Sequence, residues 1–296
     1  MVSEVVTSMV TDPDGLYVDG TVGEGGHAGR LLEVLGPEGR VIGIDRDPEA
    51  LAVAGKTLAG WGARVRLLPG NFRELPNLVG DHAGEISGIL LDLGLRSSAL
   101  DDPARGFAFQ SDGPLDMRFN PAVGESASQL LRRIREAELV RILEGGTTRA
   151  HPRRLARAML TWRRRQPLQT TGDLTRCLRE SLGRRATPKL LSSVFSALRM
   201  EVNAELEDLD RAMCELPGLL RTGGVLCVIA YQSQEDRRVK ALRRATPTDP
   251  RSGGPIRMEP LQRKPLRPTD SECRRNRRAR SARLRAYRRV EAAADS

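Results

Sequence analysis

Short apolar runs alternate with helical patterns over the first hundred residues of the chain. Apolar runs of four to eight residues bounded by turn formers are typical of buried strands, and apolar residues spaced three and four apart are typical of helices. The pattern predicts strands at Leu16–Asp19, Arg40–Asp45, 65–68 and Ile86–Asp92, and helices at 28–35 and 48–58. Strands and helices that alternate in this way form a parallel sheet covered by helices. We therefore predict an α/β fold.

More than a hundred residues separate the fourth of these strands from the next apolar run of the same character, at 225–231. A crossover between neighbouring parallel strands needs only about a dozen residues with its helix. The excess predicts an inserted domain, and its apolar residues recur at helical spacing over 126–144, 152–165, 171–182 and 188–215. We expect a sheet domain in two parts, 1–103 and 216–296, interrupted by a helical domain at 104–215.

The end of the chain contains further signals of regular structure. A helix is expected from Ser233. Ser233 and Asp236 have the spacing of a capping box, which is at least as good an interpretation of this pair as a catalytic role. Two edge strands are expected to follow, at 256–261 and 282–290. Three acidic residues near the end of the inserted domain are expected on a solvated helix face: Glu201, Glu205 and Asp208.

The composition is that of a globular protein, since 39% of the 296 residues are hydrophobic and 29% are charged. The most apolar stretch, 86–95, is too short to cross a bilayer, and the start of the chain lacks a signal-peptide pattern. We expect a cytoplasmic protein without membrane contact. Four scattered cysteines and three histidines argue against a disulfide framework or metal centre. No cysteine follows a proline. Methylation of cytosine at a ring carbon needs a cysteine nucleophile, which usually stands after a proline.

Positive charge is concentrated towards the C-terminus. The chain carries a net charge of +10, and the segment 263–289, with eleven Arg and one Lys against Asp270 and Glu272, accounts for all of it. A basic cluster favours binding to a polyanion such as RNA, although a solvated basic tail has the same composition. Five Phe, three Tyr and two Trp leave little aromatic surface for base stacking. Phosphate contacts are therefore expected to dominate affinity.

A glycine-rich turn from Asp19 to His27 joins the first strand to the first helix. Glycines let a backbone approach a ligand closely, and a helix N-terminus offers unpaired amide donors. Asp45, at the end of the second strand, suits the ribose hydroxyls of a nucleoside cofactor, and Asp19 suits the cationic amine of S-adenosylmethionine. A methyltransferase is favoured, while a dinucleotide oxidoreductase and a purely structural turn stay open. Asp92 ends the fourth strand, where open α/β sheets bind ligands, or else it caps the next turn.

Seven longer motifs run through nearly the whole chain: DGTVGEGGHAGR, VIGIDRDPEAL, GILLDLG, LDDPARGFAFQSDGPLDMRF, VFSALRMEVNAELEDL, SQEDRRVK and NRRARSARLR. In these motifs and their order the chain resembles the MraW (RsmH) family, bacterial methyltransferases that modify N4 of a cytosine in 16S ribosomal RNA. The resemblance implies a class I, Rossmann-like methyltransferase fold with an inserted helical subdomain. It also implies S-adenosylmethionine as cofactor and, as partner, 16S rRNA near the decoding centre or the whole small ribosomal subunit.

The resemblance also implies roles for individual residues. The positions that match the family's cofactor contacts are Gly25, Gly26, His27, Asp45, Phe72 and Asp92. Phe72 would stack on adenine or belong to the core, and His27 would bind the cofactor or cap its helix. Asp92, or a backbone carbonyl near Leu93, is the candidate catalytic acceptor for the target amine. The candidates for RNA contact are Asp116, Arg118, Arg199 and Asn203 in the inserted domain, and Arg277, Arg278 and Arg280 in the basic segment.

The chain departs from the family pattern at several positions. Ala99 stands where the family usually has a cofactor-binding Gln, and Gln232 where it has His. Thr147 and Thr148 replace an acidic pair, and the family's His-containing start is not recognisable before Tyr17. These departures keep open a non-catalytic protein that binds or assembles ribosomes, and a methyltransferase acting on another nucleic acid. The inserted helices also offer an interface for a homodimer.

Overall fold

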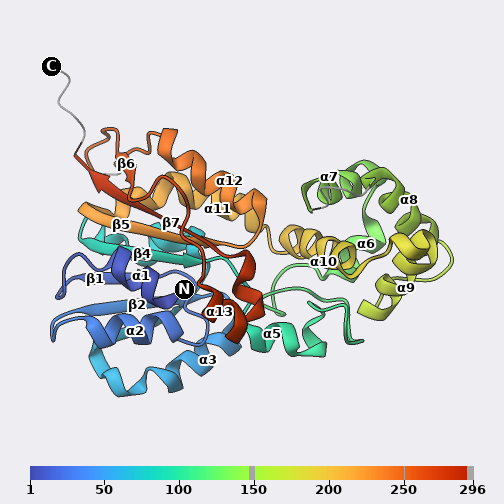
Figure 1. Cartoon of the computed structure of the whole chain (residues 1–296), viewed down its shortest axis with the longest axis horizontal. Helices are drawn as coiled ribbons and strands as arrows, with labels where there is room; N and C mark the ends of the chain where they lie inside the picture. The colour runs from blue at the N-terminus through green and yellow to red at the C-terminus, as the bar shows by residue number, and fades with distance from the viewer. Residues whose placement is uncertain (147–150, 250, 292–296) are drawn as a thin grey trace. The chain divides into compact units, whose positions relative to one another are not determined.

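The computed structural model describes residues 1–146, 151–249 and 251–291. They form two compact units, which we call unit 1 (Met1–Gly94 and Glu207–Ser296) and unit 2 (Leu95–Leu206). Figure 1 shows the elements of each unit. Both ends of unit 2 lie earlier along the chain than those of the helical domain predicted at 104–215. The positions Thr147 and Thr148 lie outside the described residues.

Unit 1 is built on a seven-stranded sheet of order β3-β2-β1-β4-β5-β7-β6. The strands are β1 (Leu16–Asp19), β2 (Arg40–Asp45), β3 (Val65–Pro69), β4 (Ile86–Asp92), β5 (Leu220–Ala230), β6 (Arg257–Pro260) and β7 (Arg283–Val290). The first five are parallel, and β7 is antiparallel to both of its neighbours. The prediction of a C-terminal edge strand is correct for β6. It is wrong for β7, which hydrogen-bonds to a strand on each side.

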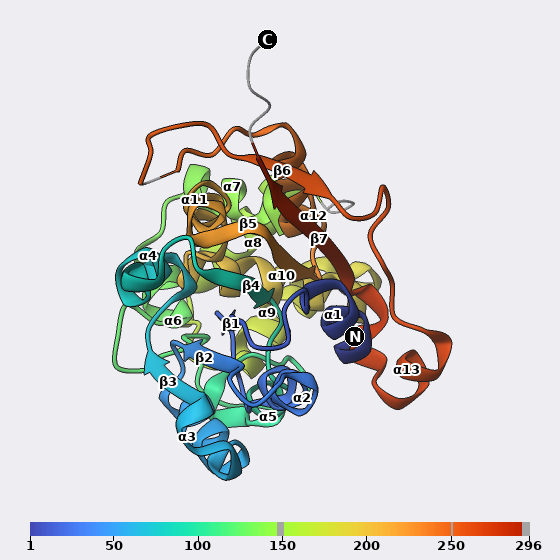
Figure 2. The ribbon, with the colours of Figure 1, turned by 90° about the vertical axis from the view of Figure 1, so that its left-hand side faces the viewer.

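Helices cover both faces of this sheet, because its strands are apolar on both sides. The first face packs against α1 (Val2–Met9), α2 (Gly26–Val34) and α3 (Pro48–Thr57). The second packs against α4 (Leu75–Leu78), α11 (Glu205–Glu215) and α12 (Ser233–Ala241). Figure 2 shows the two helical layers, together with α13 (Asp270–Arg275). The helices predicted after β1, β2 and β5 are present, whereas α1 and α13 were not predicted.

The strand order places a topological switch between β1 and β4. The chain moves from β1 to β2 and β3 on one side, and from β4 to β5 on the other. Ligands of open α/β sheets bind at the carboxyl ends of the strands beside such a switch. A sheet of this order with an antiparallel β7 is that of the class I methyltransferases, so the predicted fold class is confirmed.

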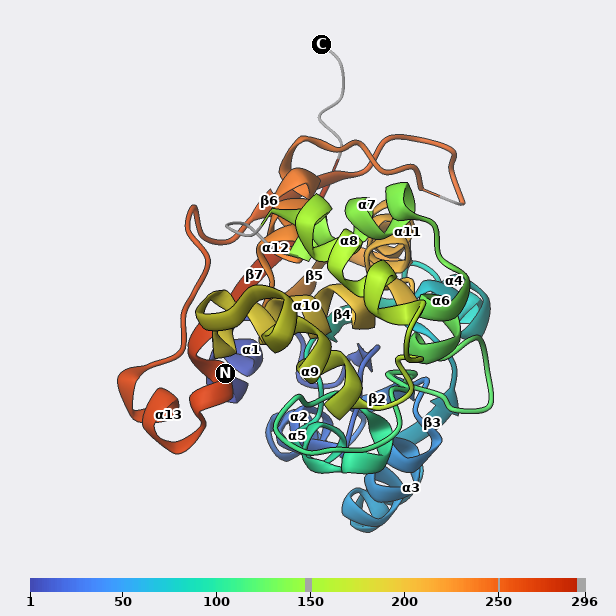
Figure 3. The same ribbon diagram turned by 90° about the vertical axis from the view of Figure 1, so that its right-hand side faces the viewer.

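Unit 2 is helical and has its own apolar core. Its helices, visible in Figure 3, are α5 (Ser97–Asp101), α6 (Ala127–Arg133), α7 (Glu136–Gly146), α8 (Pro152–Arg163), α9 (Thr171–Leu182) and α10 (Pro188–Val202). The helix predicted at 126–144 is interrupted at Ile134, whose backbone is extended. The helix predicted at 188–215 is interrupted by Asn203 and by Ala204, which has a φ of 50°. Apolar spacing continues across both breaks, so periodicity alone does not reveal them.

No helix in the described part of the chain combines the length and the apolar character needed to span a bilayer.

Candidate active site

Three aspartates end three neighbouring strands of unit 1. Asp19 is the last residue of β1, Asp45 of β2 and Asp92 of β4. Because these strands are parallel, their carboxyl ends meet at one edge of the sheet. The apolar residues that precede each aspartate are buried between the helical layers. The strands therefore place three acids beside the topological switch.

The glycine-rich turn leads from Asp19 into α2 at this edge. Gly23 and Gly25 have φ values of 54° and 90°, which side chains with a Cβ rarely adopt. A Cβ on Gly25 would also lie 3.1 Å from Cγ of Leu58, whereas the space around Gly26 is open. Gly25 is the N-cap of α2, so the first amides of that helix follow directly. The turn leaves backbone donors and free space at the sheet edge.

Asp45 holds this turn in place. One carboxylate oxygen accepts a hydrogen bond of 2.9 Å from the backbone N of Gly23, and the other accepts one of 2.9 Å from the N of Asp47. Burial raises the pKa of Asp45, while the two backbone hydrogen bonds act in the opposite direction. A carboxylate oxygen can accept more than one hydrogen bond, so Asp45 still has capacity for ligand hydroxyls.

Asp19 is 1% exposed, and only one of its two carboxylate oxygens has a hydrogen-bond partner. Its Oδ1 accepts a hydrogen bond of 3.2 Å from the N of Thr21, whereas its Oδ2 is buried without a hydrogen-bond partner. The pKa of this carboxyl is raised to about 8, chiefly by burial. The hydrogen bond from Thr21 lowers it, and the charges of Asp92 and Asp45 add to the increase. A buried acid with an unused oxygen is suited to a cationic ligand group, which would compensate the cost of ionising it.

Asp92 lies among three polar side chains of the same unit. Its backbone N donates a 2.6 Å hydrogen bond to Oγ1 of Thr21, and its Oδ2 lies 3.8 Å from Nδ1 of His27. The carboxylate Oδ1 and the Nε2 of His27 are both buried without a hydrogen-bond partner. Burial lowers the pKa of His27, and the charge of Asp92 offsets only part of this effect. The imidazole is therefore neutral at pH 7.

Tyr231 also faces Asp92 and was not predicted as a site residue. It follows the last residue of β5, and a Cβ on Gly94 would lie 2.8 Å from its ring. Burial raises the pKa of Tyr231 above its usual value, and Asp92 raises it further by its charge and as a hydrogen-bond acceptor. The strand predicted at 225–231 ends at Tyr231, and this position just past the carboxyl end of β5, at the same edge of the sheet as the three aspartates, is the signal that could have identified it.

Phe72 lies in the loop after β3 and is 7% exposed, within the core that also contains Ile44 and Leu75. Its role as an adenine contact stays a prediction. The loop is held by Asp208, at the start of α11, whose carboxylate accepts hydrogen bonds from Nδ2 of Asn71 at 2.5 Å and from Arg73 at 3.1 Å. This contact joins residues 137 positions apart in the chain, and no local pattern predicts it.

The expectation of a solvated acidic face at 201–208 is wrong for two of its three residues. Asp208 is 2% exposed, and besides Asn71 and Arg73 it lies 3.6 Å from Arg46. Glu205 is buried and binds Arg199 through two hydrogen bonds of 2.7 and 2.9 Å. Buried acids of this kind are retained where cations compensate them.

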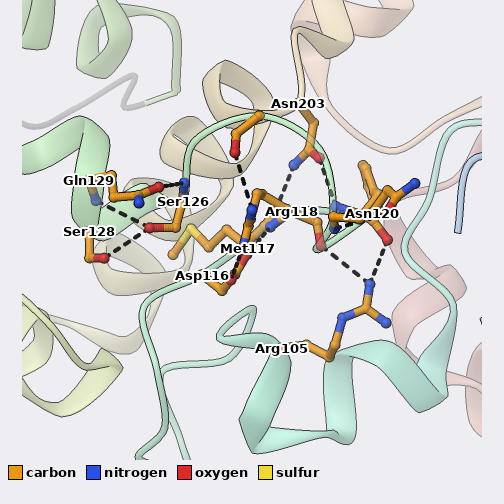
Figure 4. Close-up of polar contacts among 12 residues, drawn as sticks. Arg105, Asp116, Met117, Arg118, Asn120, Ser126, Ser128, Gln129 and Asn203 are labelled. Carbon is orange, nitrogen blue, oxygen red and sulfur yellow. Dashed lines mark hydrogen bonds and ion pairs between the residues drawn. The ribbon is translucent and has the colours of Figure 1, made fainter.

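Four of the predicted RNA-contacting residues lie in unit 2, within a chain of polar contacts drawn in part in Figure 4. Asp116 and Arg118 bind each other through two hydrogen bonds of 2.8 and 2.7 Å. Burial alone would raise the pKa of Asp116, but the hydrogen bonds and charge of Arg118 outweigh it and hold the pKa below its usual value. Asp116 is therefore a carboxylate at neutral pH, already neutralised by its neighbour.

Asn203 ties the loop of Asp116 and Arg118 to the end of α10. Its Oδ1 accepts a 2.9 Å hydrogen bond from the N of Phe119, and its Nδ2 donates to the carbonyls of Met117 and Arg199 at 2.7 and 2.9 Å. Met117 has a φ of 64°, an unfavourable conformation for a residue with a side chain. Such strain persists where surrounding contacts determine the backbone, and it is concentrated at functional sites.

The last part of the basic segment, from Arg283 onwards, forms β7 and is folded into the sheet. Arg283 and Arg285 on β7 bind Asp236 of α12 at 3.1 and 2.7 Å. Arg289 is buried, forms an ion pair with Asp249 and donates to the carbonyl of Leu220. The interpretation as a solvated tail is therefore wrong for these residues. The predicted RNA contacts in this segment, Arg277, Arg278 and Arg280, lie on the exposed turn Arg277–Ser281 (η8).

The departures from the family pattern have structural consequences of their own. Ala99 is buried in the core of unit 2. Gln232 is the N-cap of α12 and forms a capping box with Glu235. The capping box predicted for Ser233 and Asp236 is therefore wrong, and Asp236 instead binds the arginines of β7.

The site fits a sulfonium nucleoside. It combines open space at the glycine turn, an acid suited to ribose hydroxyls, and a buried acid with an unused oxygen. With the strand order, these features define an S-adenosylmethionine-dependent methyltransferase of class I. The chain belongs to the MraW methylase family, whose family model matches residues 1–290.

Similar proteins match over nearly the full length of the chain. A ribosomal RNA small subunit methyltransferase H from Thioalkalivibrio sulfidiphilus is 41% identical, covering 98% of this chain and 96% of that protein. One from Halorhodospira halophila is 44% identical, covering 94% and 89%. Among solved structures, an rRNA methylase from Streptococcus thermophilus is similar with a TM-score of 0.38 and 11% identity, covering 98% of this chain and 94% of that one.

Proposed function

We propose that this protein transfers a methyl group from S-adenosylmethionine to N4 of a cytidine in the 16S rRNA of the small ribosomal subunit, in the decoding-centre region. Family membership and the names of the relatives support the broader statement that it is an rRNA methyltransferase. The observation that carries the proposed chemistry is the carboxylate Oδ1 of Asp92, buried and without a hydrogen-bond partner at the edge of the sheet. An rRNA substrate implies a cytoplasmic site of action.

The first task of the protein is to hold and orient the methyl donor. We assign Gly25, Gly26 and His27 of the glycine turn to direct contact with the methyl donor. We assign Asp45 to its ribose hydroxyls and Phe72 to its adenine. Asp19 would accept a hydrogen bond from the ammonium group, since its unused Oδ2 and its raised pKa both favour a cation beside it. When bound, S-adenosylmethionine supplies a methyl group on a strong leaving group, so transfer to an amine requires no covalent enzyme intermediate.

The second task is to activate a poor nucleophile. The lone pair of cytosine N4 is delocalised into the ring, and a hydrogen-bond acceptor beside the amine favours its pyramidal form. Asp92 Oδ1 is such an acceptor, and the neighbouring His27 imidazole and Tyr231 hydroxyl are both neutral. Asp92 would accept a hydrogen bond from the N4 amine and would take up the proton that the amine loses during or after transfer.

Unit 2 and η8 would contact the RNA. Asp116 and Arg118 present paired donors and acceptors, and Asn203 holds the turn at Met117 by donating to its carbonyl. The guanidinium of Arg199 is buried against Glu205, so RNA contact by Arg199 stays a prediction. Arg277, Arg278 and Arg280 are exposed and would contact phosphates. A cytosine must leave its stack to be modified, which costs a few kcal/mol, and these contacts would compensate that cost.

The test is methylation of purified substrates followed by nucleoside mass spectrometry. The wild-type protein should produce N4-methylcytidine in 16S rRNA or small subunits, and the same nucleoside should be missing from cells that lack the gene. Asp92→Asn should lower the rate at least about 100-fold, the usual contribution of a positioned base. Asp81→Asn, at an exposed position of the same unit, is the matched control.

Other outcomes separate the alternatives. A product methylated at a ring carbon, or methylation of DNA instead of rRNA, would contradict the proposed specificity. Binding to the small subunit without uptake of S-adenosylmethionine in a calorimetric titration would favour a non-catalytic ribosome-binding protein. A homodimer stays a prediction, which light scattering of the purified protein tests.

A further inference from the structure

Four basic side chains on the outer side of α12 and the 3-10 turn Leu242–Arg244 (η7) are exposed to solvent. They are Arg237, Lys240, Arg243 and Arg244. Positions 237, 240 and 244 are three and four residues apart and share one face of the helical stretch. We call these four residues the α12 basic surface.

Nearby acids do not neutralise this surface. Within the described residues, none of its four side chains has an ion pair or a hydrogen bond to a carboxylate. The acids close to it are already engaged, since Asp210 pairs with Arg238 and Asp236 pairs with the arginines of β7. Glu235 accepts hydrogen bonds from the amides of Tyr231 and Gln232.

The α12 basic surface continues into a groove beside β6. This groove has a volume of about 550 Å³ and is lined by Arg243 and Arg244 on one side and by Arg257, Met258 and Glu259 on the other. The strand β6 is an edge of the sheet, and Figure 1 shows α12 and β6 at the same margin of unit 1. Arg257 pairs with Glu259 at 2.6 Å, so the net charge of the groove comes from the α12 basic surface.

The surface begins close to the edge that carries the candidate active site. The helix α12 starts at Ser233, directly after β5 ends at Ala230, on the edge where the parallel strands end. From Arg237 to Arg244 the helical rise amounts to roughly 10 Å, and the groove extends the surface further. A nucleic-acid strand leaving the active-site edge along α12 would therefore pass several unneutralised cations in succession.

The chemistry of the surface fits phosphate better than a protein partner. Guanidinium groups bind phosphate through two parallel hydrogen bonds, and unpaired cations release counterions from a polyanion on binding. Protein interfaces have an apolar centre with aromatic residues. Among the described residues, the exposed large apolar side chains are Val34, Val53 and Val123, none of which belongs to this surface.

We propose that the α12 basic surface and the adjoining groove bind the phosphate backbone of the substrate RNA outside the methylated nucleotide. This inference rests on the proposed function for the identity of the substrate. It adds a contact region separate from η8 and from the residues of unit 2.

The test compares two triple variants that remove the same charge. Arg237→Gln, Lys240→Gln and Arg244→Gln alter the proposed surface. Arg40→Gln, Lys56→Gln and Arg66→Gln are the matched control, at exposed positions on β2, α3 and β3 towards the opposite edge of the sheet. Binding to naked 16S rRNA is measured between about 50 and 200 mM salt, where phosphate contacts dominate the salt dependence.

The surface variant should lower the slope of log affinity against log salt by about 2, because each lost contact contributes about 0.7. Its affinity at low salt should fall at least about tenfold, whereas the control should change the slope by less than about 0.5. Both variants should bind S-adenosylmethionine as the wild type does, which shows that they are folded. Equal slopes for the two variants would overturn the proposal. So would unchanged binding to naked rRNA with weaker binding to small subunits, which indicates a protein partner.

The outcome is independent of the proposed specificity. If the slope falls as expected and the product is not N4-methylcytidine, the surface stands and the proposed reaction fails. If N4-methylcytidine forms and the slope is unchanged, the reaction stands and the surface fails.

Discussion

The three aspartates at the strand ends differ in how completely the protein satisfies them. Both oxygens of Asp45 accept backbone hydrogen bonds. Asp19 and Asp92 each retain one buried oxygen without a partner. Because an unpaired buried polar atom costs free energy, these two residues gain most from a bound ligand. We therefore expect pH to affect ligand binding chiefly through Asp19.

Asp19 should release a proton when S-adenosylmethionine binds below pH 8. Its pKa of about 8 keeps it protonated in the free protein at pH 6.5, and a neighbouring ammonium would ionise it. Calorimetry in buffers of different ionisation enthalpy measures the release. Asp19→Asn should abolish it and weaken binding at least about tenfold, or about 1.4 kcal/mol. Methylthioadenosine, which lacks the amine, should bind both proteins equally, and a loss for that ligand too would contradict the assignment.

Asp19 should also affect the stability of the ligand-free protein. Its folded-state pKa is raised from 3.8 to about 8, so between these values the folded state binds more protons than the unfolded state. The contribution of protonated Asp19 to the free energy of unfolding is fully present below pH 4 and is lost as the pH rises to about 8. Thermal unfolding of wild type and Asp19→Asn from pH 5 to 8 measures it. The difference in unfolding temperature between the two proteins should change with pH, and a constant difference would contradict the raised pKa of Asp19.

Tyr231→Phe tests the hydroxyl that faces Asp92. The ring would still pack on Gly94, but the carboxylate would lose a hydrogen-bond donor. A hydrogen bond to a charged group contributes about 1.5 kcal/mol, so kcat should fall roughly tenfold while KM for S-adenosylmethionine stays within about twofold. Tyr287→Phe, another buried tyrosine of unit 1, is the control and should leave both constants unchanged. An unaltered kcat in Tyr231→Phe would mean that the hydroxyl does not position Asp92.

At the scale of elements, the start of α11 holds two loops of the candidate cofactor site. Asp208 contacts Arg46 in the loop after β2, and Asn71 and Arg73 in the loop after β3. The carboxylate is buried, whereas both arginines are partly exposed. The chain returns from unit 2 at this helix, so its first turn determines the shape of loops that precede it by more than a hundred residues.

Asp208→Asn should loosen both loops without removing any group proposed to touch the cofactor. The loss of charge should lower the free energy of unfolding by about 2 kcal/mol, the contribution of hydrogen bonds to a charged group. The affinity for S-adenosylmethionine should fall several-fold, measured by calorimetry. Asp210→Asn, which breaks only the surface pair with Arg238, is the control and should change neither quantity. Wild-type affinity in Asp208→Asn would show that the loops are held by other contacts.

At the scale of the whole molecule, the distribution of positive charge matters more than its sum. The segment 263–289 has a net charge equal to that of the whole chain. Its arginines on β7 are nevertheless partly paired with Asp236 and Asp249 from other elements. The exposed cations of unit 1 that we propose for RNA contact are those of η8 and of the α12 basic surface.

Neutralising η8 should weaken RNA binding uniformly across sequences, since phosphate contacts carry no base specificity. Arg277→Gln, Arg278→Gln and Arg280→Gln together should lower the salt slope by about 2. The variant at Arg40, Lys56 and Arg66 again serves as the charge-matched control. An unchanged slope would remove η8 from the RNA-binding surface.

Sequence patterns located the strand ends and the turn correctly because both depend on neighbouring residues. An apolar run that stops at an acid marks the end of a buried strand, as at Asp92, and clustered glycines mark a turn with positive φ. Tyr231 was not predicted as a site residue, because its contact with Asp92 forms only in the folded chain. The break at Asn203 was not predicted either, since there a side chain binds the backbone of a distant loop.

The sequence by itself determined the α/β class, the bounds of β1, β2 and β4, the presence of a helical insertion and the family. Periodicity records which side of each element is buried, and motifs record local turns. Only the tertiary structure decided which charges on distant elements neutralise each other, as for Asp208 with Arg73 and Arg285 with Asp236. Ion pairing depends on which elements lie side by side, and that information is not contained in the spacing of residues along one element.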